Sequence, residues 1–60
     1  LLGKMNTYNV YIGNNLIMED IPAGDIKHKL AYLTEYFKNY PNDELRKEEI
    51  KVIKNENQKN

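Results

Sequence analysis

The strongest periodic pattern of apolar residues in this chain lies between residues 22 and 40. Its apolar side chains recur at alternating spacings of four and three, at Ile26, Leu30, Leu33, Phe37 and Tyr40. At about 100° per residue these positions share one side of a helix, so the pattern predicts an amphipathic helix that packs on an apolar surface. Pro22 suits its first turn. Pro41 predicts its end near residues 39–40, because a proline disfavours helical geometry in the residue before it.

The segment before this helix alternates in a way that is typical of strands. Residues 7–12 (TYNVYI) are rich in Tyr, Val and Ile, which favour a pleated, half-buried surface. Residues 13–15 (GNN) tolerate positive φ and predict a tight hairpin turn. A second strand then runs from Leu16 to about Asp20.

The register of this hairpin depends on the length of the turn, which the sequence leaves open. A two-residue turn at Gly13 and Asn14 places Ile17 on the same face as Val10 and Ile12. A three-residue turn places Leu16 and Met18 there instead, because a one-residue slip moves every side chain to the other face. In both registers the second strand carries apolar groups on both faces.

Two further elements are predicted after Pro41. Residues 43–49 (DELRKEE) predict a short helix with Asp43 as its N-cap and Leu45 as its one buried residue. Residues 49–55 are rich in β-branched side chains and favour a third strand. One helix over residues 43–54 is the alternative, although its apolar residues do not form a narrow stripe.

These elements together predict a small α+β domain with the order β-β-α-β. A right-handed crossover through the helix brings back the third strand. Its simplest place is beside the first strand, which gives a three-stranded antiparallel sheet of order 2-1-3 with the helix on one face. We assign residues 5–55 to this single domain, residues 1–4 to a tag or disordered extension before Met5, and residues 56–60 (ENQKN) to a disordered tail.

Size and charge narrow the classes of function. A chain of 60 residues without Cys builds a marginal core with no disulfide to brace it, so a partner or an oligomer is the expected support. Nine basic residues balance nine acidic ones, which argues against a main role on phosphate backbones or anionic lipid. No apolar run is long enough to span a membrane. The lack of Cys permits a cytoplasmic location, which we expect. The general look of the chain, and not its charge or size, suggests a bacterial or phage origin.

Residues for catalysis or metal binding are scarce. The chain has no Ser and no Cys, and Thr7 and Thr34 are its only aliphatic hydroxyls, so an activated nucleophile is hard to build. His28 shares a helix surface with Asp25 and Tyr32, but one His and one carboxylate do not complete a metal site. The adjacent acids of the chain fit capping and solvated surfaces. We therefore predict no catalytic, cofactor or metal site and no enzyme.

Tyrosines and exposed aliphatic residues are the best candidates for an interaction surface. Tyr32 and Tyr36 lie four residues apart beside the apolar stripe, with Tyr32 facing solvent and Tyr36 and Tyr40 packing partly into the edge of the core. The side of the sheet away from the helix would carry Tyr11, Ile53 and whichever of Ile17 and Met18 faces outward. Exposed apolar strips of this kind mark contact surfaces. The candidate set is Tyr11, Leu16, Ile17, Met18, Tyr32, Tyr36 and Ile53.

The second strand also predicts a mode of self-association. In the order 2-1-3 the second and third strands are edges. Lys51 and Lys54 discourage pairing at the third strand, whereas Leu16, Ile17 and Met18 leave the second strand unguarded. We therefore expect a homodimer joined through the second strand into a six-stranded sheet. A helix-mediated dimer through Tyr32 and Tyr36 is the alternative.

The predicted function is a small non-enzymatic protein-binding or regulatory module. Its expected partners are a second copy of itself and an unidentified protein. In size and general pattern it is similar to small accessory proteins of phages and other mobile elements, although no residue motif carries the likeness. A nucleic-acid-binding module is the alternative, since tyrosines lie between some of the basic residues of the chain. Two observations argue against this alternative. Asp and Glu residues between the basic ones cancel the positive potential that nucleic acid requires, and Tyr11 is the one clear aromatic residue expected on the open face of the sheet.

Overall fold

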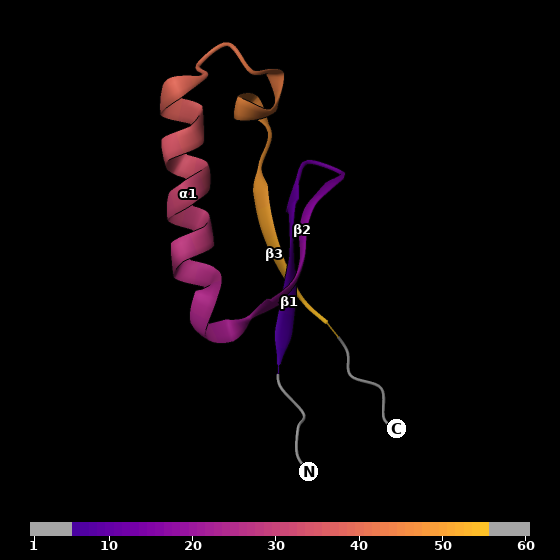
Figure 1. Cartoon of the computed structure of the whole chain (residues 1–60). Helices are drawn as coiled ribbons and strands as arrows, with labels where there is room; N and C mark the ends of the chain where they lie inside the picture. The colour runs from indigo at the N-terminus through magenta and orange to yellow at the C-terminus, as the bar shows by residue number, and fades with distance from the viewer. Residues whose placement is uncertain (1–5, 56–60) are drawn as a thin grey trace.

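The computed structural model describes residues 6–55. It contains three strands, one α-helix and two short 3-10 helices (Figure 1). In chain order these are β1 (Thr7–Ile12), β2 (Asn15–Pro22), η1 (Ala23–Asp25), α1 (Ile26–Asn39), η2 (Glu44–Lys47) and β3 (Ile50–Lys54). The predicted α+β fold is thereby confirmed, while the predictions for residues 1–4 and 56–60 lie outside the described residues.

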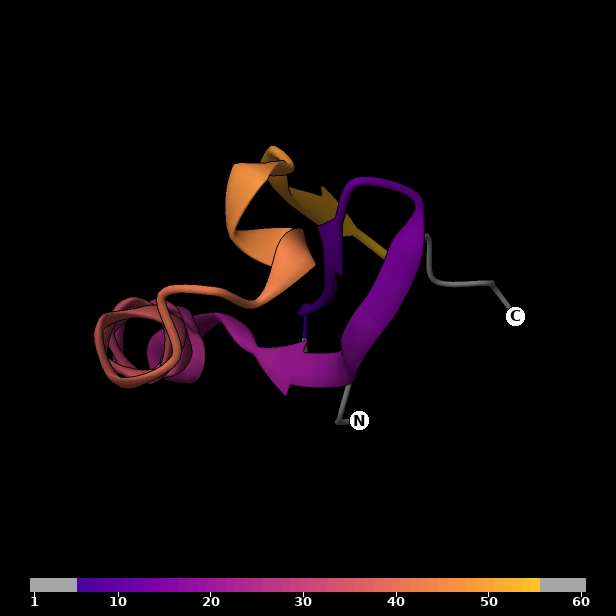
Figure 2. The same cartoon turned by 90° about the horizontal axis from the view of Figure 1, so that it is seen from above.

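The strands form one antiparallel sheet of order β2-β1-β3, as the sequence predicts. Residues 50–54 pair with β1 over five consecutive positions, from Ile12 opposite Ile50 to Tyr8 opposite Lys54. Their β-branched side chains therefore form a strand, and the alternative helix over residues 43–54 is wrong. Seen from above, α1 lies to one side of the sheet and η2 lies between α1 and the strands (Figure 2).

The β1–β2 hairpin has a two-residue turn followed by a bulge. Ile12 lies opposite Asn15 across the turn at Gly13 and Asn14. Gly13 has φ +63°, a left-handed conformation that glycine adopts without steric cost. Tyr11 pairs with Leu16 but Val10 pairs with Met18, so Ile17 is an extra residue in β2. An inserted residue of this kind changes which face the following side chains reach.

This bulge turns both Ile17 and Met18 toward the helix, where they pack against the core. The expectation that one of them faces outward is therefore wrong, and neither of the two simple registers describes the whole hairpin. Leu16 is the residue that faces away, with 47% of its surface exposed. Its partner across the strands is Tyr11.

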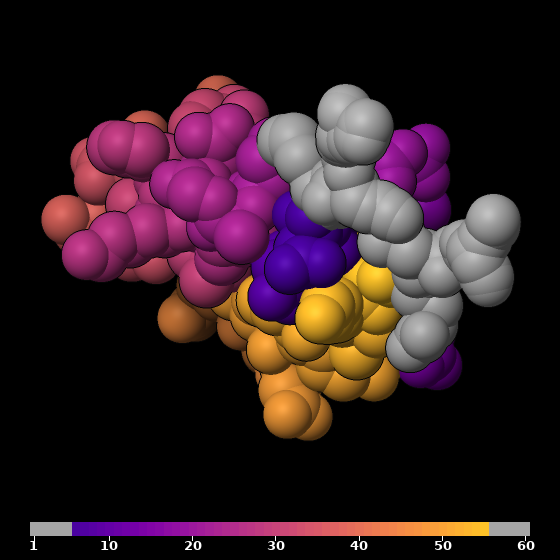
Figure 3. Space-filling view, turned by 90° about the horizontal axis from the view of Figure 1, so that it is seen from below, coloured from indigo at the N-terminus to yellow at the C-terminus, as the bar shows by residue number. Residues whose placement is uncertain are grey.

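A polar cluster on the side of the sheet away from the helix accompanies a second irregularity in β2, between the pairs of Tyr8 and Val10. Asp20 has φ +57°, and its backbone N–H donates to Asn9 Oδ1 at 3.0 Å. The Asn55 amide lies 3.0 Å from both Thr7 Oγ1 and Asn9 Oδ1 and 3.2 Å from Asp20 Oδ1. These contacts join the start of β1 to the end of β3, which lie side by side in Figure 3.

The core is small. Among residues 6–55 the buried apolar side chains are Val10, Ile12 and Leu33, at 0%, 1% and 5% exposure. Half-buried side chains surround them, at Ile17, Met18, Ile26, Leu30, Phe37 and Leu45. The predicted helix stripe is thus confirmed except at its last member. Tyr40 is 57% exposed, because α1 ends at Asn39 and the Tyr40 backbone leaves helical geometry (φ −128°, ψ 66°).

The short helix predicted after Pro41 forms as the 3-10 helix η2. Asp43 is its N-cap, and its carboxylate accepts a hydrogen bond from the Leu45 backbone N–H at 2.9 Å. Leu45 is half-buried and packs against the core cluster. This element therefore closes the upper end of the layer between α1 and the sheet.

Candidate protein-interaction site

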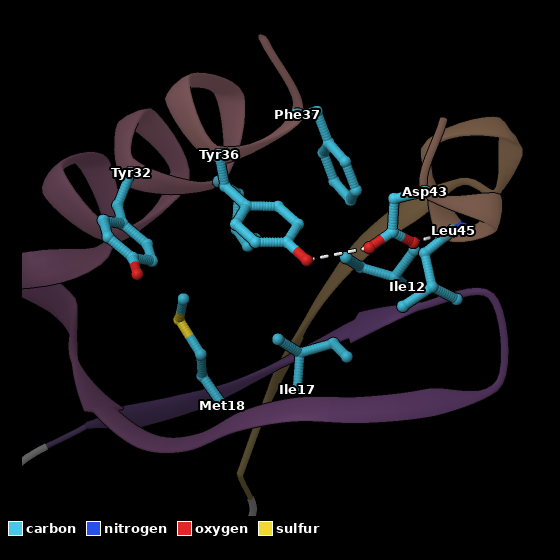
Figure 4. A pocket seen from close by; sticks show the side chains of 9 residues that line it. Ile12, Ile17, Met18, Tyr32, Tyr36, Phe37, Asp43 and Leu45 are labelled. Atoms are coloured by element: carbon cyan, nitrogen blue, oxygen red, sulfur yellow. Dashed lines mark hydrogen bonds between the residues drawn. The ribbon is translucent and has the colours of Figure 1, made fainter. Parts of the chain in front are cut away.

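An apolar groove opens between α1, β2 and η2. Its cavity volume is about 320 Å³. Two of its lining residues, Ile12 and Leu33, belong to the buried core. The labelled side chains of α1, β2 and η2 surround the opening (Figure 4). The complete lining is Ile12, Ile17, Met18, Tyr32, Leu33, Tyr36, Phe37, Asp43 and Leu45. The groove therefore continues the core outward into a surface that residues 6–55 leave uncovered.

Local structure explains how each wall of the groove forms. Tyr32 and Tyr36 are one helical turn apart, so both project from the same side of α1. Ile17 and Met18 both point toward the helix from β2 because of the bulge (Figure 4). Four of the seven candidate interaction residues thus line one groove.

A hydrogen bond closes one end of the groove. Tyr36 Oη donates to Asp43 Oδ2 at 2.8 Å, while Asp43 Oδ1 accepts from the Leu45 N–H. One carboxylate therefore caps η2 and ties it to α1. The bond to Asp43, followed by partial burial and the negative charge of the carboxylate, raises the pKa of Tyr36 above the usual range of a tyrosine. The neutral phenol is the form that this site favours.

This bond predicts a loss of stability at alkaline pH. The folded state raises the pKa of Tyr36, so its contribution is fully present below the unfolded value of about 10 and is lost as the pH rises through the folded value. In urea denaturation, Tyr36→Phe should have a lower free energy of unfolding than the parent at neutral pH. The difference between the two proteins should shrink above about pH 10, as Tyr36 of the parent ionises. Parallel losses in the two proteins would contradict the prediction, because other groups would then carry the pH dependence.

The other three candidate residues gather on the opposite face of the sheet. Tyr11 and Ile53 line a shallow hollow together with Gly13, Asn14 and Lys51. Leu16 lies beside Tyr11 as its cross-strand partner. The seven candidates therefore form two separate groups, one on each side of the sheet.

Sequence reasoning missed two exposed apolar residues on β3. Ile50 and Val52 share the helix-facing side of the sheet with Ile12 and Val10, their partners in β1. They nevertheless remain 39% and 38% exposed, because α1 and η2 do not cover this strand fully. The alternation of residues 49–52 places both on one face, but only the position of the helix shows that this part of the face is open.

Other chemistry is sparse in the described part of the chain. His28 and Asp25 are exposed. Across residues 6–55, no three His, Asp or Glu side chains come together in a group that could hold a metal ion. Among the helices of the same region, none is long and apolar enough to cross a membrane. A function can thus be argued from three features: the groove, the hollow beside Tyr11 and Ile53, and the exposed apolar residues Ile50 and Val52 of β3.

Comparison with known proteins gives no family or relative from which to argue. No family model matches the chain, no curated protein matches it, and no solved structure matches it.

Proposed function

We propose that this chain is a small non-enzymatic protein-binding module that also associates with itself. The observation that supports this most is the apolar groove above an unusually small core. In the described residues three apolar side chains are buried, and two of them, Ile12 and Leu33, line an open cavity together with seven less buried residues. A protein partner that fills the groove would extend the core and supply the support that a domain of this size lacks.

The lining of the groove resembles the centre of a protein interface in composition. It contains Tyr32, Tyr36, Phe37 and Met18, and these residue types are enriched at such centres, where charged residues are depleted. The single ionisable carboxylate of the lining, Asp43, already accepts two hydrogen bonds. Met18 adds a flexible side chain that adapts to different apolar shapes. The partner should therefore insert a large aliphatic or aromatic side chain.

Nucleic acid is the second candidate, and the described surface favours it less. Tyr11 and Lys51 lie together on the open face of the sheet, which is the pairing that a stacked base would use. Single-stranded RNA and DNA usually stack on several aromatic side chains in a positive groove. Residues 6–55 place no second tyrosine in this hollow.

A selection of random peptides tests the groove. Peptides enriched on the parent protein should contain an aromatic or aliphatic anchor. Their affinity should fall about tenfold or more for Tyr32→Ala, because Tyr32 lines the groove and the loss of one aromatic hot-spot contact costs about 1–2 kcal/mol or more. Tyr11→Ala, on the opposite face, is the matched control and should leave the affinity unchanged. Circular dichroism of both variants checks that the fold is retained.

Three results would count against the groove. If no peptide is enriched, or if Tyr32→Ala binds the selected peptides as the parent does, the groove is not a peptide site. If binding instead falls steeply with salt for a single-stranded oligonucleotide and requires Tyr11 and Lys51, the nucleic-acid alternative is correct.

A further inference from the structure

Strand β3 carries a concentration of exposed apolar surface. Six large apolar residues of the described chain are exposed, and three of them, Ile50, Val52 and Ile53, lie in this strand. Since side chains alternate along a strand, Ile50 and Val52 lie on the helix side and Ile53 on the opposite side. Both faces of β3 therefore carry exposed apolar side chains, besides Lys51 and Lys54, where it forms the edge of the sheet.

The backbone of β3 presents a regular edge. Gly13 N donates to Glu49 O at 2.8 Å, and Asn55 N donates to Thr7 O at 2.9 Å. In an antiparallel ladder these contacts alternate, so Ile50, Val52 and Lys54 turn their N–H and C=O groups away from β1. No strand of residues 6–55 lies on that side. An edge of unpaired groups is a template for another strand.

The two edges of the sheet differ in regularity. β3 pairs with β1 without interruption, whereas two irregularities break the pairing of β2. Bulges twist an edge away from flat pairing. The structure thus makes β2, the edge that the sequence favours for dimerisation, the poorer template. β3 is therefore the better template for pairing with a second copy.

We propose that two copies of the chain join through their β3 edges, antiparallel, with a two-fold axis at Val52. This inference rests on the self-association part of the proposed function and is separate from the groove. About that axis Val52 meets Val52 of the second copy, and Ile50 lies opposite Lys54. All three residues with outward-turned backbone groups then find partners in the second copy. The result is one continuous sheet of order β2-β1-β3-β3-β1-β2.

The lysines of β3 fit this register. With the two-fold axis at Val52, each lysine of β3 lies opposite an isoleucine of the second copy. Lys51 pairs with Ile53, and Lys54 pairs with Ile50. No lysine lies directly opposite another, and the aliphatic stems cover the isoleucine side chains. Centring the pair on Lys51 would oppose two lysines, which is unfavourable. Centring it on Ile53 would leave Ile50 without a partner in β3.

Charge exchange at residue 52 tests the axis directly. Val52→Lys and Val52→Glu each place like charges face to face in the dimer. The dimer dissociation constant of each variant alone should therefore be more than about tenfold higher than that of the parent. A mixture of the two should restore a dimer containing one copy of each. Sedimentation equilibrium measures both effects against the 7.1 kDa chain mass. Leu16→Lys, the same kind of change on the β2 edge, is the matched control and should dimerise like the parent.

A second measurement does not depend on the variants folding. In a mixture of isotope-labelled and unlabelled parent protein, isotope-filtered NMR should show a contact between the Val52 methyl groups of the two copies. A monomeric parent at high micromolar concentration would overturn the inference, as would a dimer that Leu16→Lys or Tyr32→Ala dissociates while the Val52 variants do not. The peptide selection tests the groove on its own, so either proposal can fail without the other.

Discussion

Leu33→Ala is expected to lower the free energy of unfolding by about 2–5 kcal/mol. Leu33 is 5% exposed and is the one residue of α1 that is buried, where it packs against Val10 and Ile12. Truncation would remove its packing and leave a cavity between the helix and the sheet. Small domains have little stability in reserve, so the variant should be substantially unfolded at moderate urea concentrations, measured by circular dichroism.

The same truncation at an exposed position provides the comparison. Leu16 is 47% exposed on the opposite side of the sheet, and Leu16→Ala should cost roughly 0.5 kcal/mol or less, as most surface substitutions do. Both variants must be compared with the parent at one protein concentration, because self-association adds to apparent stability. If Leu33→Ala and the parent unfold at the same urea concentration, the side of α1 that carries Leu33 does not pack against the sheet.

The elements of this fold are predictable because each has a local cause. The four-three spacing of Ile26, Leu30, Leu33 and Phe37 specifies a buried helix side, and these residues do pack against the core. The Gly13–Asn14 turn and Pro41 set the ends of the elements by their backbone preferences. Order 2-1-3 follows from the short hairpin and the handed crossover. The helix, the turn and the ends of the elements depend on residues close together in the sequence, whereas the strand order pairs β1 with the distant β3.

The hairpin bulge is not predictable in the same way. Its extra residue is Ile17, and it lies near a second irregularity of β2, where Asp20 has a left-handed backbone and its N–H donates to Asn9 Oδ1 on the neighbouring strand. Residues eleven apart in sequence make that contact, and no local pattern of apolar residues records it. The bulge at Ile17 nevertheless changes which face the side chains that follow it in β2 reach, up to the second irregularity.

The candidate site was predictable only in its parts. Tyr32 and Tyr36 follow from the helical period, as neighbours on one side of α1. Their meeting with Ile17 and Met18 depends on the bulge, and the closed end of the groove depends on the bond between Tyr36 and Asp43. Exposure at Ile50 and Val52 depends on where the helix lies over the sheet. These are tertiary properties. The sequence therefore predicts four of the groove residues as candidates, but it does not predict that they line one groove.

Asp43 is the residue whose loss should affect both the fold and the groove. Asp43→Ala removes the N-cap of η2, which alone costs about 0.5–2 kcal/mol, and it also leaves the Tyr36 hydroxyl without its acceptor. Free of both contacts, η2 should separate from α1, and Leu45 would no longer be held at the end of the groove. The variant should therefore lose stability in urea denaturation and also bind groove-selected peptides more weakly.

Three further variants separate the two roles of Asp43. Asp43→Ser keeps an N-cap but is too short to reach Tyr36, so it should match Tyr36→Phe in stability and in peptide affinity. Glu44→Ala, an exposed acid at the adjacent position, should change neither. If Asp43→Ala binds the peptides as tightly as the parent despite its lower stability, η2 is not a wall of the binding site. The site would then be confined to the surfaces of α1 and β2.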